Sequence, residues 1–216
     1  MTLDFGALDS EGFCTAHSVL DTDLLRLVEP LGRVRVDPRN PELVRDIQPQ
    51  HIEVAKPNTL SSRYGTGGFP FHTDTAHWER PARYLLLYCV SPGEGMRPTR
   101  LKDSRAWQLT DQEMSLACRA LWAVGHRRVR LAHFAVAAGD RLSVRYDMDC
   151  MRPMTSEAKE LKALLQHRIE TTVETRNAWE PGNLLVIDNH RMVHARGEAS
   201  RPDANRLLKR ILIGGN

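Results

Sequence analysis

Apolar residues recur with helical spacing in three segments of the chain and gather in short, strand-like runs elsewhere. The helical spacing predicts helices over 21–31, 111–122 and 155–175. Apolar or alternating runs, most of them bounded by glycine, proline or polar residues, predict strands over 33–36, 84–90, 98–101, 127–135, 141–146, 184–187 and 206–213. Gly139-Asp140 is typical of a hairpin turn between two of these strands.

The order of these elements favours a mainly β fold with flanking helices. Several strands follow one another with helices inserted, without the regular strand–helix alternation that indicates a parallel sheet. A closed or double-sheet architecture such as a jelly roll fits this order. The 216 residues show no composition shift that would mark a linker, so a single domain over 1–216 is expected.

Composition argues against several classes of partner and site. The net charge is only +3 and the arginines are dispersed, so no nucleic-acid partner is expected. No apolar run is long enough to cross a bilayer, and the first residues lack the features of a signal peptide, so no membrane partner and a cytoplasmic location are expected. A zinc knuckle or disulfide framework is disfavoured because the four cysteines are scattered without a CxxC pair.

The most informative chemistry begins at His72 and Asp74. Two positions apart on an extended backbone, an imidazole and a carboxylate leave the same face and can bind one ion. The apolar Phe69 and Phe71 before them indicate a strand that enters the core, where a carboxylate is costly unless it meets a cation. The loop-rich segment 48–68 directly before this pair is expected to form a wall of a substrate pocket.

A third metal ligand is expected from the distant stretch 188–194, where His190 and His194 are both candidates. Two imidazoles and one carboxylate form a facial triad that leaves coordination positions open and typically holds non-heme Fe(II). A zinc hydrolase is less favoured, because no glutamate stands beside either motif to act as general base. Three further residues border the first motif and are candidates to line the pocket, or else to serve in packing: Tyr64, His77 and Trp78.

Two stretches resemble a known family. The downstream stretch, Trp179-Glu180-Pro181-Gly182-Asn183-Leu184-Leu185-Val186-Ile187-Asp188-Asn189, continues into His194-Ala195-Arg196 and then Arg206-Leu207-Leu208-Lys209-Arg210. It resembles the C-terminal signature of the taurine dioxygenase and clavaminate synthase-like family of Fe(II)/2-oxoglutarate-dependent oxygenases. Phe69-Pro70-Phe71-His72-Thr73-Asp74 resembles that family's first metal motif. The resemblance covers about 67–214 and implies a double-stranded β-helix, the jelly roll of cupin-like proteins.

The resemblance also implies roles for individual residues. It assigns iron to His72, Asp74 and His194, which selects His194 over His190. It places the far carboxylate of 2-oxoglutarate on Arg206 and Thr99, and brings Arg210 to the cosubstrate or to an anionic substrate group. Arg145 lies in a strand motif that resembles a substrate-facing strand of amino-acid oxygenases. For Arg210 and Arg145, an exposed arginine on a strand is the alternative.

The implied activity is an Fe(II)- and 2-oxoglutarate-dependent dioxygenase that uses O2 and releases succinate and CO2. Hydroxylation of an unactivated C–H bond in an amino acid or an amino-acid-derived metabolite is the expected outcome. Desaturation, epoxidation or cyclisation in natural-product biosynthesis would use the same cofactor chemistry, and a non-catalytic jelly-roll protein that binds metal or ligand is the alternative of another class. A halogenase is disfavoured, because in the family it carries a small residue at the position of Asp74.

The expected substrate is a small molecule that is either carboxylate-bearing or carrier-bound. Only a turn, a strand and a helix are predicted between Val90 and Arg127, where relatives often insert a lid. The sequence therefore predicts an open active site, or one completed by a second subunit such as that of a homodimer.

Overall fold

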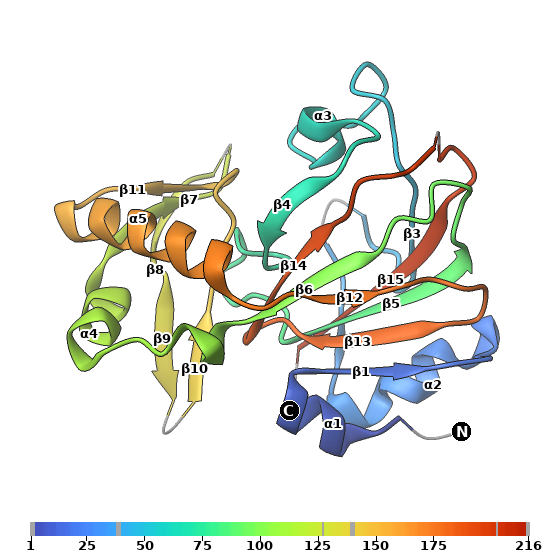
Figure 1. Cartoon of the computed structure of the whole chain (residues 1–216), viewed down its shortest axis with the longest axis horizontal. Coiled ribbons are helices and arrows are strands. Elements are labelled where there is room, and N and C mark those ends of the chain that lie inside the picture. The colour runs from blue at the N-terminus through green and yellow to red at the C-terminus, as the bar shows by residue number, and fades with distance from the viewer. Residues whose placement is uncertain (1–2, 38–39, 127, 139–140, 202, 215–216) are drawn as a thin grey trace.

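The computed structural model describes residues 3–37, 40–126, 128–138, 141–201 and 203–214 (Figure 1). Two antiparallel sheets form its centre, and a lobe of smaller sheets and helices extends to one side. Among the described residues, no helix combines the length and the apolar character that crossing a membrane requires.

The larger central sheet has six strands. Its order is β1-β13-β5-β15-β2, and β3 also pairs with β15. The strands are β1 (Phe13–Ala16), β2 (Val34–Arg35), β3 (Arg45–Ile47), β5 (Tyr84–Ser91), β13 (Leu184–Asp188) and β15 (Leu207–Ile213). All of the pairings are antiparallel.

The smaller central sheet has the order β12-β6-β14-β4. Its strands are β4 (Phe69–His72), β6 (Thr99–Asp103), β12 (Thr175–Asn177) and β14 (Met192–Arg196). Leu101 and Met192 from this sheet pack against Leu85, Leu87 and other apolar residues of the larger sheet. The apolar layer between the two antiparallel sheets confirms the predicted double-sheet architecture.

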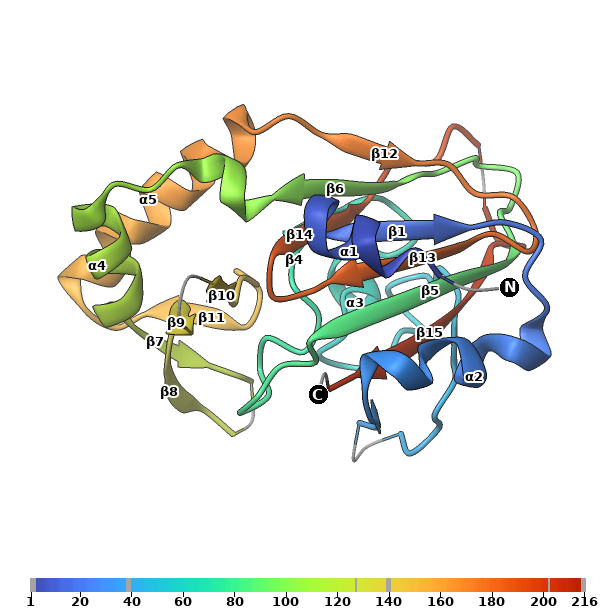
Figure 2. The same cartoon turned by 90° about the horizontal axis from the view of Figure 1, so that it is seen from below.

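The opposite face of the larger sheet is covered by the N-terminal helices, which Figure 2 shows from below. Because side chains alternate along a strand, Leu86 and Tyr88 face these helices while Leu85 and Leu87 face the smaller sheet. The helical segments are α1 (Phe5–Glu11), α2 (Leu24–Val28) and two 3₁₀ turns on either side of α2, η1 (Asp21–Asp23) and η2 (Glu29–Leu31).

The side lobe has its own apolar core, which includes Trp122, Phe134, Leu161 and Leu165. It contains the sheets β11-β7-β8 and β10-β9. Its elements are η3 (Ser104–Trp107), α4 (Asp111–Arg119), β7 (Leu121–Val124), β8 (Arg130–His133), β9 (Ala135–Ala138), β10 (Arg141–Val144), β11 (Met151–Pro153) and α5 (Ser156–Thr171).

Three predicted elements need correction. The helix expected over 155–175 ends at Thr171, because Thr172 turns to an extended conformation (φ −68°, ψ 136°), and Thr175 begins β12. The helix expected over 111–122 ends at Arg119, because Ala120 turns to an extended conformation (φ −57°, ψ 126°) and Leu121 begins β7. The strand expected over 127–135 is two strands, β8 and β9. The predicted hairpin turn at Gly139-Asp140 lies outside the described residues, although the strands on either side of it pair as expected.

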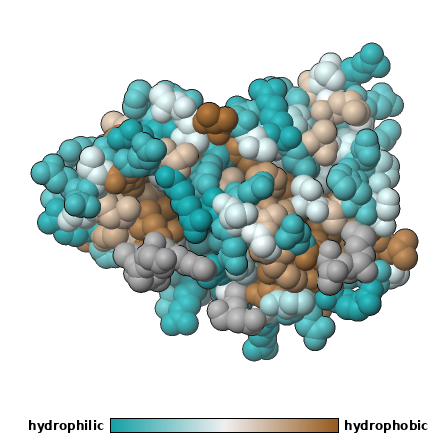
Figure 3. Space-filling model, turned by 60° about the horizontal axis from the view of Figure 1, so that its bottom comes forward, coloured by the Kyte–Doolittle hydropathy of each residue, from teal (hydrophilic) through white to brown (hydrophobic). Residues whose placement is uncertain are grey.

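The surface in Figure 3 is hydrophilic over most of the face shown, with apolar residues in separate areas. Exposed large apolar side chains include Leu131 and Val136 of the side lobe and Val173 after α5.

Candidate active site

The three predicted metal ligands meet between strands β4 and β14 of the smaller sheet. His72 ends β4, Asp74 follows it, and His194 lies opposite His72 in the antiparallel pairing. The Nε2 atoms of His72 and His194 lie 3.4 Å and 3.6 Å from Oδ1 of Asp74. One ligand atom from each residue lies within 4.8 Å of the others. All three side chains are buried, and this arrangement fits the facial triad of a non-heme iron site.

The outer oxygen of the Asp74 carboxylate is held by Arg210, whose Nη1 donates to Oδ2 at 2.8 Å. This contact leaves Oδ1 facing the two imidazoles. Burial disfavours the charged carboxylate, but the Arg210 guanidinium and hydrogen bonds from His194 and His72 outweigh burial and hold the pKa of Asp74 well below its usual range. Arg210 therefore acts on the metal-binding carboxylate in this structure.

Asn189 fixes the backbone around Asp74. Its side-chain oxygen accepts the N–H of Asp74 at 2.7 Å, and its amide donates to the carbonyls of Asp74 and Ala82 at 3.0 Å and 2.7 Å. His72 is oriented by a 3.1 Å contact between its Nδ1 and the carbonyl of Pro70. Outer contacts of this kind orient metal ligands.

The two imidazoles differ in how readily they bind a proton. For His72, burial opposes the proton, but the hydrogen bond and charge of Asp74 raise its pKa above the ordinary value. For His194, burial and then the charge of His72 lower its pKa. Metal binding requires both rings to be neutral, so protons compete with the metal more strongly at His72 than at His194.

The triad opens into a cavity of about 1030 Å³. Its wall includes parts of the segment 48–68, as predicted, among them Gln48, Lys56 and Arg63. The stretch from Val90 to Arg127, which was expected to supply no long lid, contributes only Thr99, Gly125 and His126 among its described residues. That the site is open to a bulky substrate stays a prediction.

Arg206 and Thr99 both line this cavity, where the resemblance places the far carboxylate of 2-oxoglutarate. Arg206 is 3% exposed, its Nε has no partner, and its guanidinium donates no hydrogen bond to the described residues. Burial and the neighbouring charge of Arg97 lower the pKa of Arg206 to about 10. A buried guanidinium without an acceptor fits a carboxylate ligand, because such a cation is costly to bury alone.

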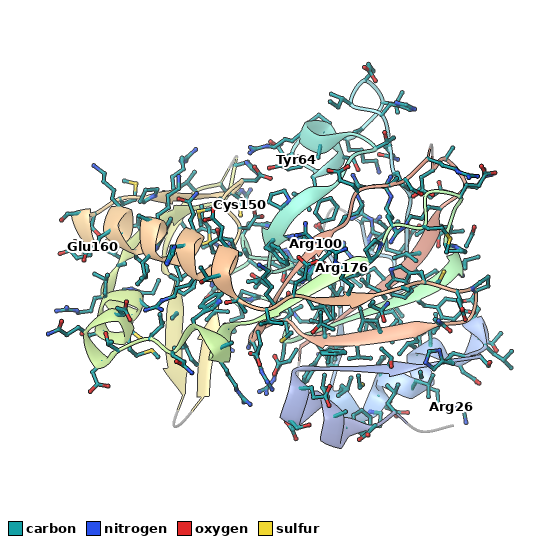
Figure 4. All side chains as sticks on the ribbon, viewed as in Figure 1. Arg26, Tyr64, Arg100, Cys150, Glu160 and Arg176 are labelled. Atoms are coloured by element: carbon teal, nitrogen blue, oxygen red, sulfur yellow. The ribbon has the colours of Figure 1, made fainter. Side chains whose placement is uncertain are left out.

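Two candidate substrate residues lie away from the cavity wall. Arg145 was predicted to face substrate, but its guanidinium donates to the carbonyls of Ala76, Trp78 and Glu79 at 2.6–3.0 Å. These bonds occupy it in holding the connection after Asp74. Tyr64 extends from α3 (Ser61–Tyr64; Figure 4), where its hydroxyl donates to Asp149 at 3.2 Å.

His77 and Trp78 do line the cavity. The Arg35 guanidinium lies over the Trp78 ring, 4.8 Å from the ring centroid. His190, the alternative ligand, lies apart from the triad, and its Nε2 is 3.3 Å from the carbonyl of Pro81.

Sequence reasoning missed two acidic residues of the cavity wall, Asp147 and Asp149. The charge of Asp147 acts on His72, which places it near the metal site. Asp149 accepts from Arg63 through Oδ1, while its Oδ2 is buried without a partner among the described residues. Their spacing, two positions apart like His72 and Asp74, was the signal that could have identified them.

Comparison with known proteins agrees with this geometry. Residues 126–212 match the family described as taurine catabolism dioxygenase TauD, TfdA family. No match was found among curated protein sequences. Among solved structures, asparagine oxygenase in complex with Fe(II), hydroxyasparagine and succinate superposes with a TM-score of 0.74 at 18% identity, covering 97% of this chain and 77% of that chain.

Two further structures have the same fold. The non-heme iron oxygenase OrfP in complex with Fe, succinate and (3S)-hydroxy-L-Arg gives a TM-score of 0.76 at 17% identity, covering 98% of this chain and 79% of that one. PvcB from Pseudomonas aeruginosa gives 0.68 at 20% identity, with 97% and 78% covered. The predicted double-stranded β-helix is confirmed.

The fold and the buried triad fit the class of Fe(II)/2-oxoglutarate-dependent oxygenases. The part of the chain that matches the TauD/TfdA family model, residues 126–212, contains the second of the two motifs from which the resemblance was inferred. The donor set of the triad suits Fe(II), and the similar structure of OrfP holds Fe and alpha-ketoglutaric acid (2-oxoglutarate).

Proposed function

We propose that this protein is an Fe(II)- and 2-oxoglutarate-dependent oxygenase that hydroxylates an unactivated C–H bond of an amino acid or of a small metabolite derived from one, and releases succinate and CO2. When bound, the iron with 2-oxoglutarate and O2 supplies the oxidising chemistry, while the protein supplies binding and orientation. The observation that carries the proposal is a cavity with charges of both signs beside the triad.

A free amino acid carries both charges and needs partners of both signs. Asp147 and Asp149 offer carboxylates on one part of the wall, and the buried Oδ2 of Asp149 still lacks a donor among the described residues. Arginines of the wall can donate hydrogen bonds to the substrate carboxylate. The similar structures of asparagine oxygenase and OrfP contain hydroxylated amino acids, which supports the same class of substrate here.

We assign Arg206 and Thr99 to the far carboxylate of 2-oxoglutarate. In the variant Arg206→Gln, we expect the affinity for 2-oxoglutarate to fall by about tenfold to a hundredfold, since a charged hydrogen-bonding partner is lost. Arg206→Lys keeps the charge without the planar fork and should lose less. Calorimetric titration of the iron-loaded protein without O2 measures both.

The substrate proposal is tested by turnover over a panel of free and carrier-bound amino acids. The expected result is succinate formation matched by a product one oxygen atom heavier. Asp147→Asn and Asp149→Asn should raise KM for that amino acid and leave KM for 2-oxoglutarate unchanged. Absence of both metal uptake and 2-oxoglutarate binding would instead support a non-catalytic protein.

A further inference from the structure

Thr99 receives a hydrogen bond from a side chain that contributes nothing to the cavity wall. The indole Nε1 of Trp179 donates to Oγ1 of Thr99 at 3.1 Å. Thr99 is the first residue of β6, and Trp179 follows β12, the neighbouring strand in Figure 1. Both residues are buried, and the Trp179 ring packs between the two central sheets.

This bond limits where the Thr99 hydroxyl can direct its hydrogen. An indole N–H only donates, whereas a hydroxyl has one hydrogen and two lone pairs. With one lone pair occupied by Trp179, the hydrogen of Thr99 must point elsewhere. It meets no acceptor among the described residues, and the side chain borders the cavity that Arg206 also lines.

We propose that Trp179 is a positioning residue for 2-oxoglutarate. By donating to Thr99 it fixes the threonine as a hydrogen-bond donor toward the cavity, where the far carboxylate binds beside Arg206. The inference rests on the proposed role of Thr99 and Arg206. Trp179 would thus affect the affinity for 2-oxoglutarate from outside the cavity wall, through the orientation of the Thr99 hydroxyl.

Packing alone does not explain the contact. Trp107 and Trp122 are buried tryptophans of the same chain, and the Nε1 of each lacks a hydrogen-bond partner among the described residues. The protein therefore accommodates a buried indole without giving its N–H an acceptor. The alignment of Trp179 with Thr99 is a particular feature of this end of the cavity.

The experiment compares Trp179→Phe with the matched control Trp122→Phe. Each substitution removes an indole N–H and keeps an aromatic ring, but only the first removes a hydrogen bond to Thr99. Binding is measured by calorimetry on the iron-loaded protein without O2, for 2-oxoglutarate and for 2-oxobutyrate, which lacks the far carboxylate. Thermal unfolding of each variant establishes that it is folded at the assay temperature.

In Trp179→Phe, we expect 2-oxoglutarate to bind about fivefold more weakly, as the loss of one neutral hydrogen bond implies. Binding of 2-oxobutyrate should stay unchanged. Trp122→Phe should leave both affinities unchanged. In the double variant with Thr99→Val, the loss should equal that of Thr99→Val alone, because Trp179 acts through the hydroxyl.

Three results would overturn the inference. One is unchanged 2-oxoglutarate affinity in Trp179→Phe while Thr99→Val weakens it. Another is an equal loss for both ligands, which indicates a general disturbance of the site. The third is a loss in Trp179→Phe that adds fully to that of Thr99→Val. If neither Thr99→Val nor Arg206→Gln changes 2-oxoglutarate binding, the proposed cosubstrate site itself fails.

Discussion

Replacing Arg210 by methionine tests how the metal-binding carboxylate is stabilised before the metal arrives. Arg210 and Asp74 are 20% and 11% exposed and joined at 2.8 Å. Methionine keeps part of the apolar stem and removes the charge, so Asp74 loses its arginine partner while staying buried. Breaking a buried ion pair costs about 3–5 kcal/mol, and the partial exposure of Arg210 favours the lower end. For a domain of this size, about 3 kcal/mol lowers Tm by roughly 9 °C.

The assay is thermal unfolding of Arg210→Met with and without Co(II) as a substitute for Fe(II). A bound metal ion compensates the Asp74 charge, so the variant should lose much less stability when loaded, and the rise in Tm caused by the metal should exceed that of the original protein. Arg26→Met is the control, because the Arg26–Asp23 pair is exposed (70% and 36%; Arg26 is labelled in Figure 4) and contributes little. An equal fall in Tm with and without metal would refute the reasoning.

Three further outcomes are expected. Asp203→Asn leaves the buried Arg97 without its ionic partner, so urea unfolding should show a loss of about 3–5 kcal/mol, and a loss below about 1 would contradict the pairing. Gly93→Ala should destabilise by about 2 kcal/mol or more in the same assay, because Gly93 has φ +74° and an added Cβ would lie 1.8 Å from an Asp203 oxygen; unchanged stability would disprove this close contact. Asp74 raises the pKa of His72 against the effect of burial, so Co(II) affinity should fall by up to about tenfold per pH unit as the pH drops below that pKa. An affinity independent of pH would contradict this. In the metal-free protein, the stability contributed by protonated His72 is present at low pH and is lost as the pH rises through that pKa.

The sequence predicted those parts of the fold whose signal is local. The strand at 84–90 was predicted from a continuous apolar run that ends at Ser91-Pro92-Gly93, and the structure has β5 there. The short run Leu121–Val124 could not be separated from the preceding helix, because apolar residues at this length suit either state. Its pairing with β8 and β11, which follow it along the chain, decides in favour of a strand.

In the candidate site too, the features with a local sequence signal could be predicted and those that depend on distant residues could not. The triad could be predicted because each motif is short and its residue types define the chemistry. The bond from Trp179 to Thr99 joins residues 80 positions apart, and nothing local indicates it. Arg145 belongs to a stretch that was predicted as a substrate-facing strand, but it follows the end of β10. Its partners are backbone carbonyls of the connection after Asp74, which no sequence pattern specifies.

The charges at the two ends of the site are arranged differently. At the metal end, Asp74 already has a cationic partner in Arg210 and two imidazoles beside it. At the other end lie three buried arginines, Arg97, Arg196 and Arg206, and the buried carboxylate of Asp203. Burial and the positive charge of Arg97 lower the pKa of both Arg196 and Arg206.

The guanidinium groups of Arg97 and Arg196 donate hydrogen bonds to carbonyls of the turn 65–67, which leads into β4. Of the three, Arg206 is the arginine whose guanidinium has no acceptor among the described residues. Since a buried positive charge is costly, this end of the cavity favours an anion before any ligand binds. A carboxylate placed there would relieve that cost at Arg206, next to the charged cluster that also holds the turn before His72.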